Sequence, residues 1–180
     1  MNWHRIGRTT EHPAGIARYL IRGNHLYVFC DGTATLQQWR WNIMTLTRRL
    51  QGGARASRAD WEQAHDAYIE LRYAVDIGRF HDITISGYSR GGAIAILLAW
   101  MIGAPASAFV FAGKRVGNRK LMRGVVHSNY WHRGDPVPWL PFRYAAYSNR
   151  LVFRPWMWPW KAHMETAHTA AYWRYEVANT

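Results

Sequence analysis

Apolar residues along this chain form short runs that alternate with stretches of helical spacing. The short runs predict strands at 26–30, 82–86, 108–112, 125–131 and 150–153. Helices are expected at 36–50, from 57 or 58 to 77, around 93–99 and at 166–177, with a break at Gly52-Gly53. Strands that alternate with helices predict an α/β fold, with a mostly parallel central sheet flanked by helices.

One short motif stands between a predicted strand and a predicted helix. Gly87-Tyr88-Ser89-Arg90-Gly91 follows the apolar run 83–85 and precedes the helix-forming stretch 93–99. A Gly-x-Ser-x-Gly motif in this setting is typical of a nucleophilic serine on a sharp strand-to-helix turn. Side chains at 87 and 91 would clash within such a turn, which explains the two glycines. The helix N-terminus then offers N–H groups to an oxyanion.

Few residues downstream of Ser89 are able to complete a catalytic triad. In folds with this motif the acid follows the serine and the histidine follows the acid. Glu165 stands only three residues before His168, a poor geometry for orienting an imidazole, and Glu176 follows every histidine. Asp135 is therefore the best-placed acid, although Asp before proline also commonly starts a turn. The base is His163 or His168, and the residues alone leave both open.

Four further blocks of sequence surround the serine motif in a fixed order. They are Val28-Phe29-Cys30-Asp31-Gly32-Thr33 with Trp39 and Asn42, His65 with Ala67-Tyr68, the block 111–118, and Gly134-Asp135-Pro136-Val137-Pro138-Trp139-Leu140-Pro141. Together the five blocks, over about 27–172, resemble the class 3 lipases, the fungal-lipase-like branch of the α/β-hydrolases. The resemblance implies a small single-domain α/β-hydrolase over residues 1–180. It also implies a serine ester hydrolase (lipase or esterase) that cleaves carboxylic esters of lipids or short-chain acyl groups.

The same resemblance suggests roles for individual residues. It implies Ser89 as the nucleophile, Asp135 as the acid, and Thr33 with the backbone N–H of Arg90 in the oxyanion hole. The family's histidine lies near the C-terminus just before an aromatic residue, a setting that favours His168 over His163. The candidate substrate-binding residues are Tyr88, Trp139 and Leu140.

The chain departs from the family pattern at three places near these residues. Tyr88-Ser89-Arg90 replaces His-Ser-Leu, Cys30-Asp31 replaces Phe-Arg, and Lys114 stands where the family has proline. Arg90 either favours substrates with anionic parts or points into solvent and pairs elsewhere. Two alternative functions therefore remain: a phospholipase acting at anionic membrane surfaces, and a hydrolase-like basic binding protein without activity.

The formal net charge of +12 comes almost entirely from arginine. Arginines bind phosphates well, so nucleic acid and anionic membranes are both candidate partners. No zinc-finger spacing, basic zipper or RNA-binding sheet signature is present, so no dedicated nucleic-acid site is expected. An anionic lipid surface fits a lipid hydrolase better.

The remaining composition excludes several classes of site. Cys30 is the single cysteine, so no intramolecular disulfide forms. Residues 1–8 lack the apolar segment of a signal peptide, which predicts a cytoplasmic protein or one released without such a peptide. The uncharged stretch 91–113 is interrupted by Gly103 and Pro105, so we expect a buried helix and strand rather than a membrane span. None of the nine histidines has a metal-binding spacing, and no metal or cofactor is expected.

Overall fold

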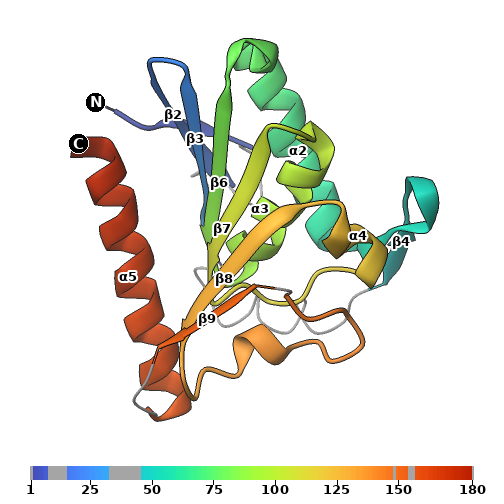
Figure 1. Cartoon of the computed structure of the whole chain (residues 1–180), viewed down its shortest axis with the longest axis vertical. Coiled ribbons are helices and arrows are strands. Elements are labelled where there is room, and N and C mark those ends of the chain that lie inside the picture. The colour runs from blue at the N-terminus through green and yellow to red at the C-terminus, as the bar shows by residue number, and fades with distance from the viewer. Residues whose placement is uncertain (1, 8–15, 33–45, 148, 154–156, 180) are drawn as a thin grey trace.

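The centre of the molecule is a seven-stranded sheet (Figure 1). A computed structural model describes residues 2–7, 16–32, 46–147, 149–153 and 157–179. Within them the strands of the sheet, in spatial order, are β1 (His4–Ile6), β2 (Ala17–Arg22), β3 (His25–Cys30), β6 (Asp82–Tyr88), β7 (Ala106–Phe111), β8 (Val126–His132) and β9 (Arg150–Phe153). β1, β2 and β3 pair antiparallel, and every pair from β3 to β9 is parallel. The predicted α/β fold with a mostly parallel sheet is confirmed.

Helices lie on both faces of this sheet. α2 (Arg58–Ala74) and α3 (Arg90–Ile102) pack together on one face, and α5 (Pro159–Asn179) runs along the other (Figure 1). The short helix α4 (Arg119–Arg123) lies beside a hairpin of β4 (Thr47–Arg49) and β5 (Arg55–Ser57). Three single turns of 3-10 helix complete the described chain: η1 (Gln51–Gly53), η2 (Ile77–Arg79) and η3 (Val137–Trp139).

The larger hydrophobic core lies between the sheet and the pair α2 and α3. Residues 90 to 99 of α3 are all buried, because the helix meets the sheet on one side and α2 on the other. A smaller aromatic core of Phe29 and Phe111 packs under α5 against Trp173 and Ala170. The uncharged stretch 91–113 thus forms α3 and β7, as predicted. Of the helices described here, none is both long and apolar enough to cross a membrane.

Three predicted helices differ from the observed ones, and the smallest difference is that α2 ends at Ala74 rather than at 77. The end of the helix predicted at 36–50 is wrong, because Thr47–Arg49 forms strand β4 and pairs with β5; residues 36–45 lie outside the described ranges. The last helix begins at Pro159 rather than near 166. Proline suits the first turn of a helix, where its missing N–H would have no acceptor anyway. As a result both candidate histidines lie on α5.

Candidate active site

Ser89 occupies the sharp turn between β6 and α3. Its φ of 55° and ψ of −116° lie in a region that residues with side chains rarely adopt. Its N–H donates to the Phe111 carbonyl at 2.9 Å, and its carbonyl accepts from the N–H groups of Gly92 at 3.1 Å and Lys114 at 3.2 Å. These three bonds hold the strained conformation. The turn therefore has the backbone form that the Gly-x-Ser-x-Gly motif predicts.

Gly87 and Gly91 allow the chain to close this turn. A Cβ atom at 87 would overlap the backbone of Gly91 itself. A Cβ at 91 would overlap the Cys30 carbonyl and lie 2.7 Å from the carbonyl oxygen of Asp31. The predicted need for glycine at both positions is confirmed. The close approach also brings the end of β3 against the nucleophile turn.

Asp135 is bound to His163, and its two oxygens have different partners. Asp135 follows β8 and is 1% exposed. Its Oδ1 accepts a hydrogen bond from the Val137 N–H at 2.9 Å, and its Oδ2 lies 2.9 Å from His163 Nδ1. Because a carboxylate only accepts, this hydrogen bond requires a proton on Nδ1, and Nε2 on the opposite side of the ring is then the acceptor of the neutral imidazole. A general base needs this tautomer and orientation.

The expectation that His168 bridges Ser89 and Asp135 is wrong. The His168 side chain is 73% exposed, with its Nδ1 4.0 Å from Glu165 on the outer surface of α5. His163 is buried on the same helix instead of standing in an exposed loop. Five residues turn a helix by about 140° beyond a full revolution, so the two imidazoles cannot both face Asp135. Because α5 begins at Pro159, His163 lies on the helix and is the one that faces Asp135.

Tyr88, in the nucleophile turn, contacts His163 through both its ring and its hydroxyl. Its ring centroid lies 4.8 Å from that of the imidazole, and its hydroxyl donates to the His163 backbone carbonyl at 3.0 Å. Burial and, secondarily, the carboxylate of Asp135 raise the pKa of this hydroxyl, so it stays protonated and able to donate. The predicted contact of Tyr88 with substrate stays a prediction, and its hydroxyl is engaged with α5. Because Tyr88 directly precedes Ser89, the contact brings the imidazole beside the serine turn.

Of the two residues predicted to form the oxyanion hole, the structure describes only Arg90. Thr33 lies outside the described residues, so its role stays a prediction. Gly32, which directly precedes it, reaches the turn: a Cβ there would lie 2.9 Å from the Tyr88 carbonyl oxygen. Arg90 is the first residue of α3, where a backbone N–H has no acceptor inside the helix. The Arg90 N–H is thus free of the helix ladder and adjoins Ser89.

The side chain of Arg90 is engaged in a buried ionic cluster. Its Nε donates to Asp60 Oδ1 at 3.1 Å, and Lys114 Nζ lies 2.8 Å from Asp60 Oδ2. Burial alone would raise the pKa of the Asp60 carboxyl, but Lys114 and Arg90 outweigh this effect and lower it. Arg90 therefore pairs elsewhere, as one of the two interpretations held, but its side chain is buried and the expected orientation into solvent is wrong.

The segment after Asp135 borders the site. Trp139, in η3, is 44% exposed, with the Arg115 guanidinium 5.7 Å from its ring centroid. The Leu140 carbonyl accepts from the Arg115 N–H at 2.8 Å, which holds the segment in place. Trp139 and Leu140 therefore remain candidate substrate-binding residues. Within the described part of the chain, no cluster of three or more His, Cys, Asp or Glu is placed to hold a metal ion.

Sequence reasoning missed Asp60. It belongs to the buried stripe of α2, at helical spacing with Ala64, Ala67 and Leu71. The helix predicted from 57 or 58 to 77 includes this position, but no role was predicted for it. A signal was nevertheless present: Arg90 and Lys114 stand where the family has apolar residues, and cations that are buried at such positions need an anion nearby.

Comparison with known proteins identifies the family of the sequence and relatives of the fold. The sequence profile of the family described as Lipase (class 3) matches residues 27–145. The fold is similar to Rhizomucor miehei triacylglyceride lipase, with a TM-score of 0.62 at 16% identity over 78% of this chain and 60% of that one. A lipase from Yarrowia lipolytica gives a TM-score of 0.61 at 16% identity, over 74% of this chain and 60% of that one. The mono- and diacylglycerol lipase of Aspergillus oryzae gives 0.53 at 23% identity, over 66% and 49%.

These matches leave part of the relatives unmatched. The chain covers only 49% to 60% of the length of the three lipases. The family profile includes Ser89 and Asp135 but ends before His163. No curated protein sequence gives a significant match.

Proposed function

The chain belongs to the class 3 lipase family, and we propose that it hydrolyses carboxylic esters of lipids or short-chain acyl groups through Ser89, Asp135 and His163. The observation that carries this proposal is the 2.9 Å contact between Asp135 and His163 beside the strained serine turn. An acid and an oriented base at the C-terminal edge of a parallel sheet are what a nucleophilic serine requires.

The mechanism is acyl transfer to water. His163 Nε2 takes the proton of Ser89 Oγ as this oxygen attacks the ester carbonyl, and Asp135 stabilises the resulting imidazolium. The backbone N–H of Arg90 and that of Thr33 bind the oxyanion. The same imidazolium protonates the departing alcohol, and water then attacks the acyl-serine with His163 again as base.

Covalent labelling together with turnover tests this function. A fluorophosphonate should label the protein at Ser89, and Ser89→Ala should lose labelling and roughly four orders of magnitude or more in kcat. Ser107→Ala, on β7, is the matched control and should behave as wild type. A folded Ser89→Ala variant with normal turnover would refute the proposal. A wild-type protein that neither hydrolyses esters nor reacts would instead be the inactive basic binding protein.

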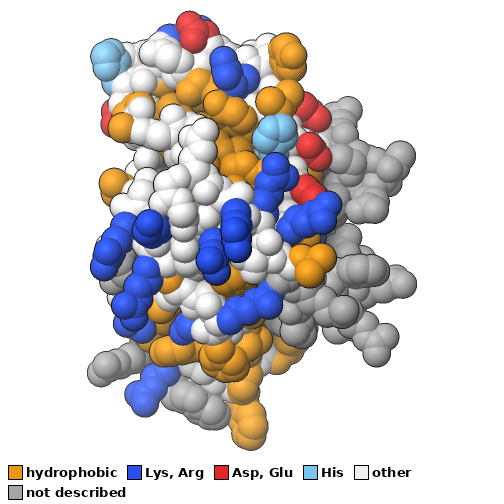
Figure 2. All heavy atoms as spheres, turned by 90° about the vertical axis from the view of Figure 1, so that its right-hand side faces the viewer, with side chains coloured by type: hydrophobic (Ala, Val, Ile, Leu, Met, Phe, Trp, Pro, Cys, Tyr) orange, Lys and Arg blue, Asp and Glu red, His pale blue; other side chains and the backbone are white. Residues whose placement is uncertain are grey.

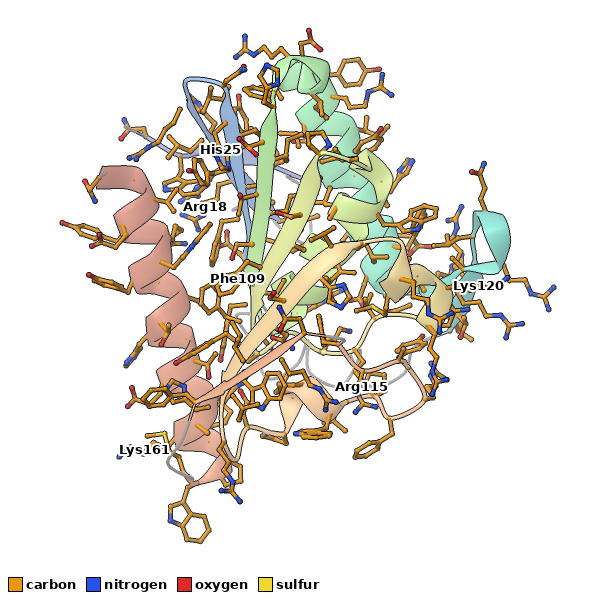
Figure 3. All side chains as sticks on the ribbon, in the orientation of Figure 1. Arg18, His25, Phe109, Arg115, Lys120 and Lys161 are labelled. Atoms are coloured by element: carbon orange, nitrogen blue, oxygen red, sulfur yellow. The ribbon has the colours of Figure 1, made fainter. Side chains whose placement is uncertain are left out.

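A second candidate, a phospholipase at anionic membranes, is favoured by the distribution of charge. Residues 113–164 contain ten lysines and arginines but a single acidic residue, Asp135, which is buried. Figure 2 shows cationic side chains gathered across the face that carries α4 and β4, with hydrophobic side chains below them. Figure 3 shows Lys120 beside β4 on this face, Arg115 lower in the molecule, and Lys161 at the start of α5 on the other side. Such a surface suits substrates held in an anionic bilayer.

Exposed aromatic side chains adjoin the same region. Trp139 and Phe142 follow the acid, while Trp158 and Trp160 precede the histidine, and all four are exposed. Tryptophan favours the boundary between water and lipid. The segments that carry Asp135 and His163 would therefore be the ones nearest the membrane.

A further inference from the structure

Three charged side chains are buried together behind the nucleophile turn. Asp60, Arg90 and Lys114, here called the Asp60 cluster, have side-chain exposures of 0%, 10% and 7%. They come from α2, from the start of α3 and from the loop after β7. Removing charges from water is costly even when they are paired, and apolar side chains of similar size often stabilise a fold as well or better. Stability alone is therefore a weak reason for the cluster.

Both cations of the cluster adjoin Ser89 through the backbone. Arg90 follows Ser89 directly and carries the N–H that faces the oxyanion in the proposed mechanism. Lys114 donates its backbone N–H to the Ser89 carbonyl at 3.2 Å. The single carboxylate of Asp60 thus ties together two segments that adjoin Ser89, one through the peptide bond and one through a hydrogen bond to its carbonyl.

The loop around Lys114 is itself held in place. Tyr147 donates its hydroxyl to the Lys114 carbonyl at 3.0 Å. The Asn129 side chain accepts from the Gly113 N–H at 3.0 Å and donates to the Gly113 carbonyl at 3.1 Å. Because these hydrogen bonds hold the loop, a displacement of Lys114 would also displace the Ser89 carbonyl to which its N–H is bonded.

We propose that Asp60 is a positioning residue for the nucleophile: by binding Arg90 and Lys114 it fixes the Ser89 backbone and the Arg90 N–H in their reactive geometry. This inference rests on the proposed ester hydrolysis. It also explains two departures from the family together, since Arg90 and Lys114 meet at the same carboxylate. With one anion and two cations, the cluster adds no net negative charge beside the developing oxyanion.

Three variants separate positioning from stability. Asp60→Asn keeps the shape but leaves two buried cations unbalanced. The triple variant Asp60→Leu/Arg90→Leu/Lys114→Met replaces the whole cluster by apolar groups and is expected to fold. Lys114→Met removes one cation and leaves the pair of Asp60 and Arg90. Asp66→Asn, an exposed position on the same helix, is the matched control. Each is measured for thermal unfolding, for kcat and KM on a soluble short-chain ester, and for the rate of fluorophosphonate labelling.

Positioning predicts a specific loss of turnover. Since a small misplacement of a reactive group costs about 100-fold, the folded cluster variants should lose about 10- to 100-fold in kcat and labelling rate, with KM within about threefold of wild type. Lys114→Arg should recover part of the loss of Lys114→Met, and Asp66→Asn should match wild type. A folded triple variant with kcat within about threefold of wild type would overturn the proposal. Absence of activity and labelling in the wild-type protein would instead remove the hydrolase function on which it rests.

Discussion

At the residue scale, the two carboxylate oxygens of Asp135 have different roles. Oδ1 accepts from the Val137 N–H and shapes the turn into η3, while Oδ2 orients His163. Initiation of a turn and orientation of a base are therefore compatible roles for one carboxylate. The imidazole, in turn, is positioned by Asp135 through its ring and by Tyr88 through its backbone carbonyl.

The two histidines of α5 should differ sharply when they are replaced. His163→Ala removes the group that accepts the serine proton, so kcat should fall by about four orders of magnitude, as for other triad members. His168→Ala alters an exposed side chain and should stay within about twofold of wild type. Steady-state hydrolysis of a soluble ester measures both variants, with circular dichroism to establish folding. An inactive His168→Ala beside an active His163→Ala would contradict the assignment.

At the scale of secondary-structure elements, the site depends on how closely α3 approaches β3. Gly91 in the first turn of α3 lies against the carbonyls of Cys30 and Asp31, at the end of β3. Asp31 is also bound by Arg18 of β2 at 2.9 Å and by Arg174 of α5 at 3.4 Å. The chain that leads to Thr33 is thus held between the nucleophile helix on one side and α5 on the other.

Gly91→Ala should disrupt this packing. The added methyl group meets backbone atoms that have no freedom to rotate away, so we expect a loss of about 1–3 kcal/mol in the free energy of unfolding. Ester hydrolysis should fall as well, because α3 carries the Arg90 N–H. Gly78→Ala is the matched control, since the nearest atom to its Cβ is a side-chain oxygen of Asp76 at 3.4 Å. Urea unfolding measures both; equal stability of the two variants would argue against a close contact at Gly91.

At the scale of the whole molecule, charge is distributed unevenly. The cationic segment 113–164 supplies the acid and the base of the site, whereas the acidic side chains Asp76 and Asp82 lie near the opposite ends of the strands. An anionic surface would therefore attract the molecule with its site facing the lipid.

Vesicle binding tests this orientation. The protein should co-sediment with vesicles that contain phosphatidylserine, less with neutral phosphatidylcholine vesicles, and less at high salt because ions screen the attraction. Each cation at the surface contributes about 1 kcal/mol, so Arg143→Glu/Lys161→Glu should weaken binding by at least tenfold. Arg72→Glu/Arg79→Glu, an equal change of charge at the far end of α2 and in η2, should have a smaller effect.

The outcomes of this experiment are distinct. Equal weakening by the two double variants would mean that only net charge matters and that no face is preferred. Tighter binding to nucleic acid than to anionic vesicles would contradict the expectation that the protein has no dedicated nucleic-acid site. Turnover of phospholipid in these vesicles would support the phospholipase candidate over an esterase of soluble substrates.

Local interactions allowed the sequence by itself to determine much of this protein. The alternation of apolar runs and helical spacing predicted the parallel sheet and α2. The motif at 87–91 predicted a sharp turn at Ser89 that requires glycine two positions before and two positions after the serine. Asp135 followed from chain order. The helices, the strands and the glycine at 87 depend on neighbours within a few positions along the chain, where sequence spacing translates directly into geometry. Gly91 also meets the carbonyls of Cys30 and Asp31, which are remote in sequence.

Only the tertiary structure decided which histidine meets the acid and what neutralises Arg90. His163 and His168 lie on one helix, so the choice depends on where α5 begins and how it is rotated against β8. Asp60 lies 30 residues before Arg90, and its contact with Lys114 depends on how α2 packs beside α3. Such contacts join positions remote in sequence, and the packing of whole elements sets their distances.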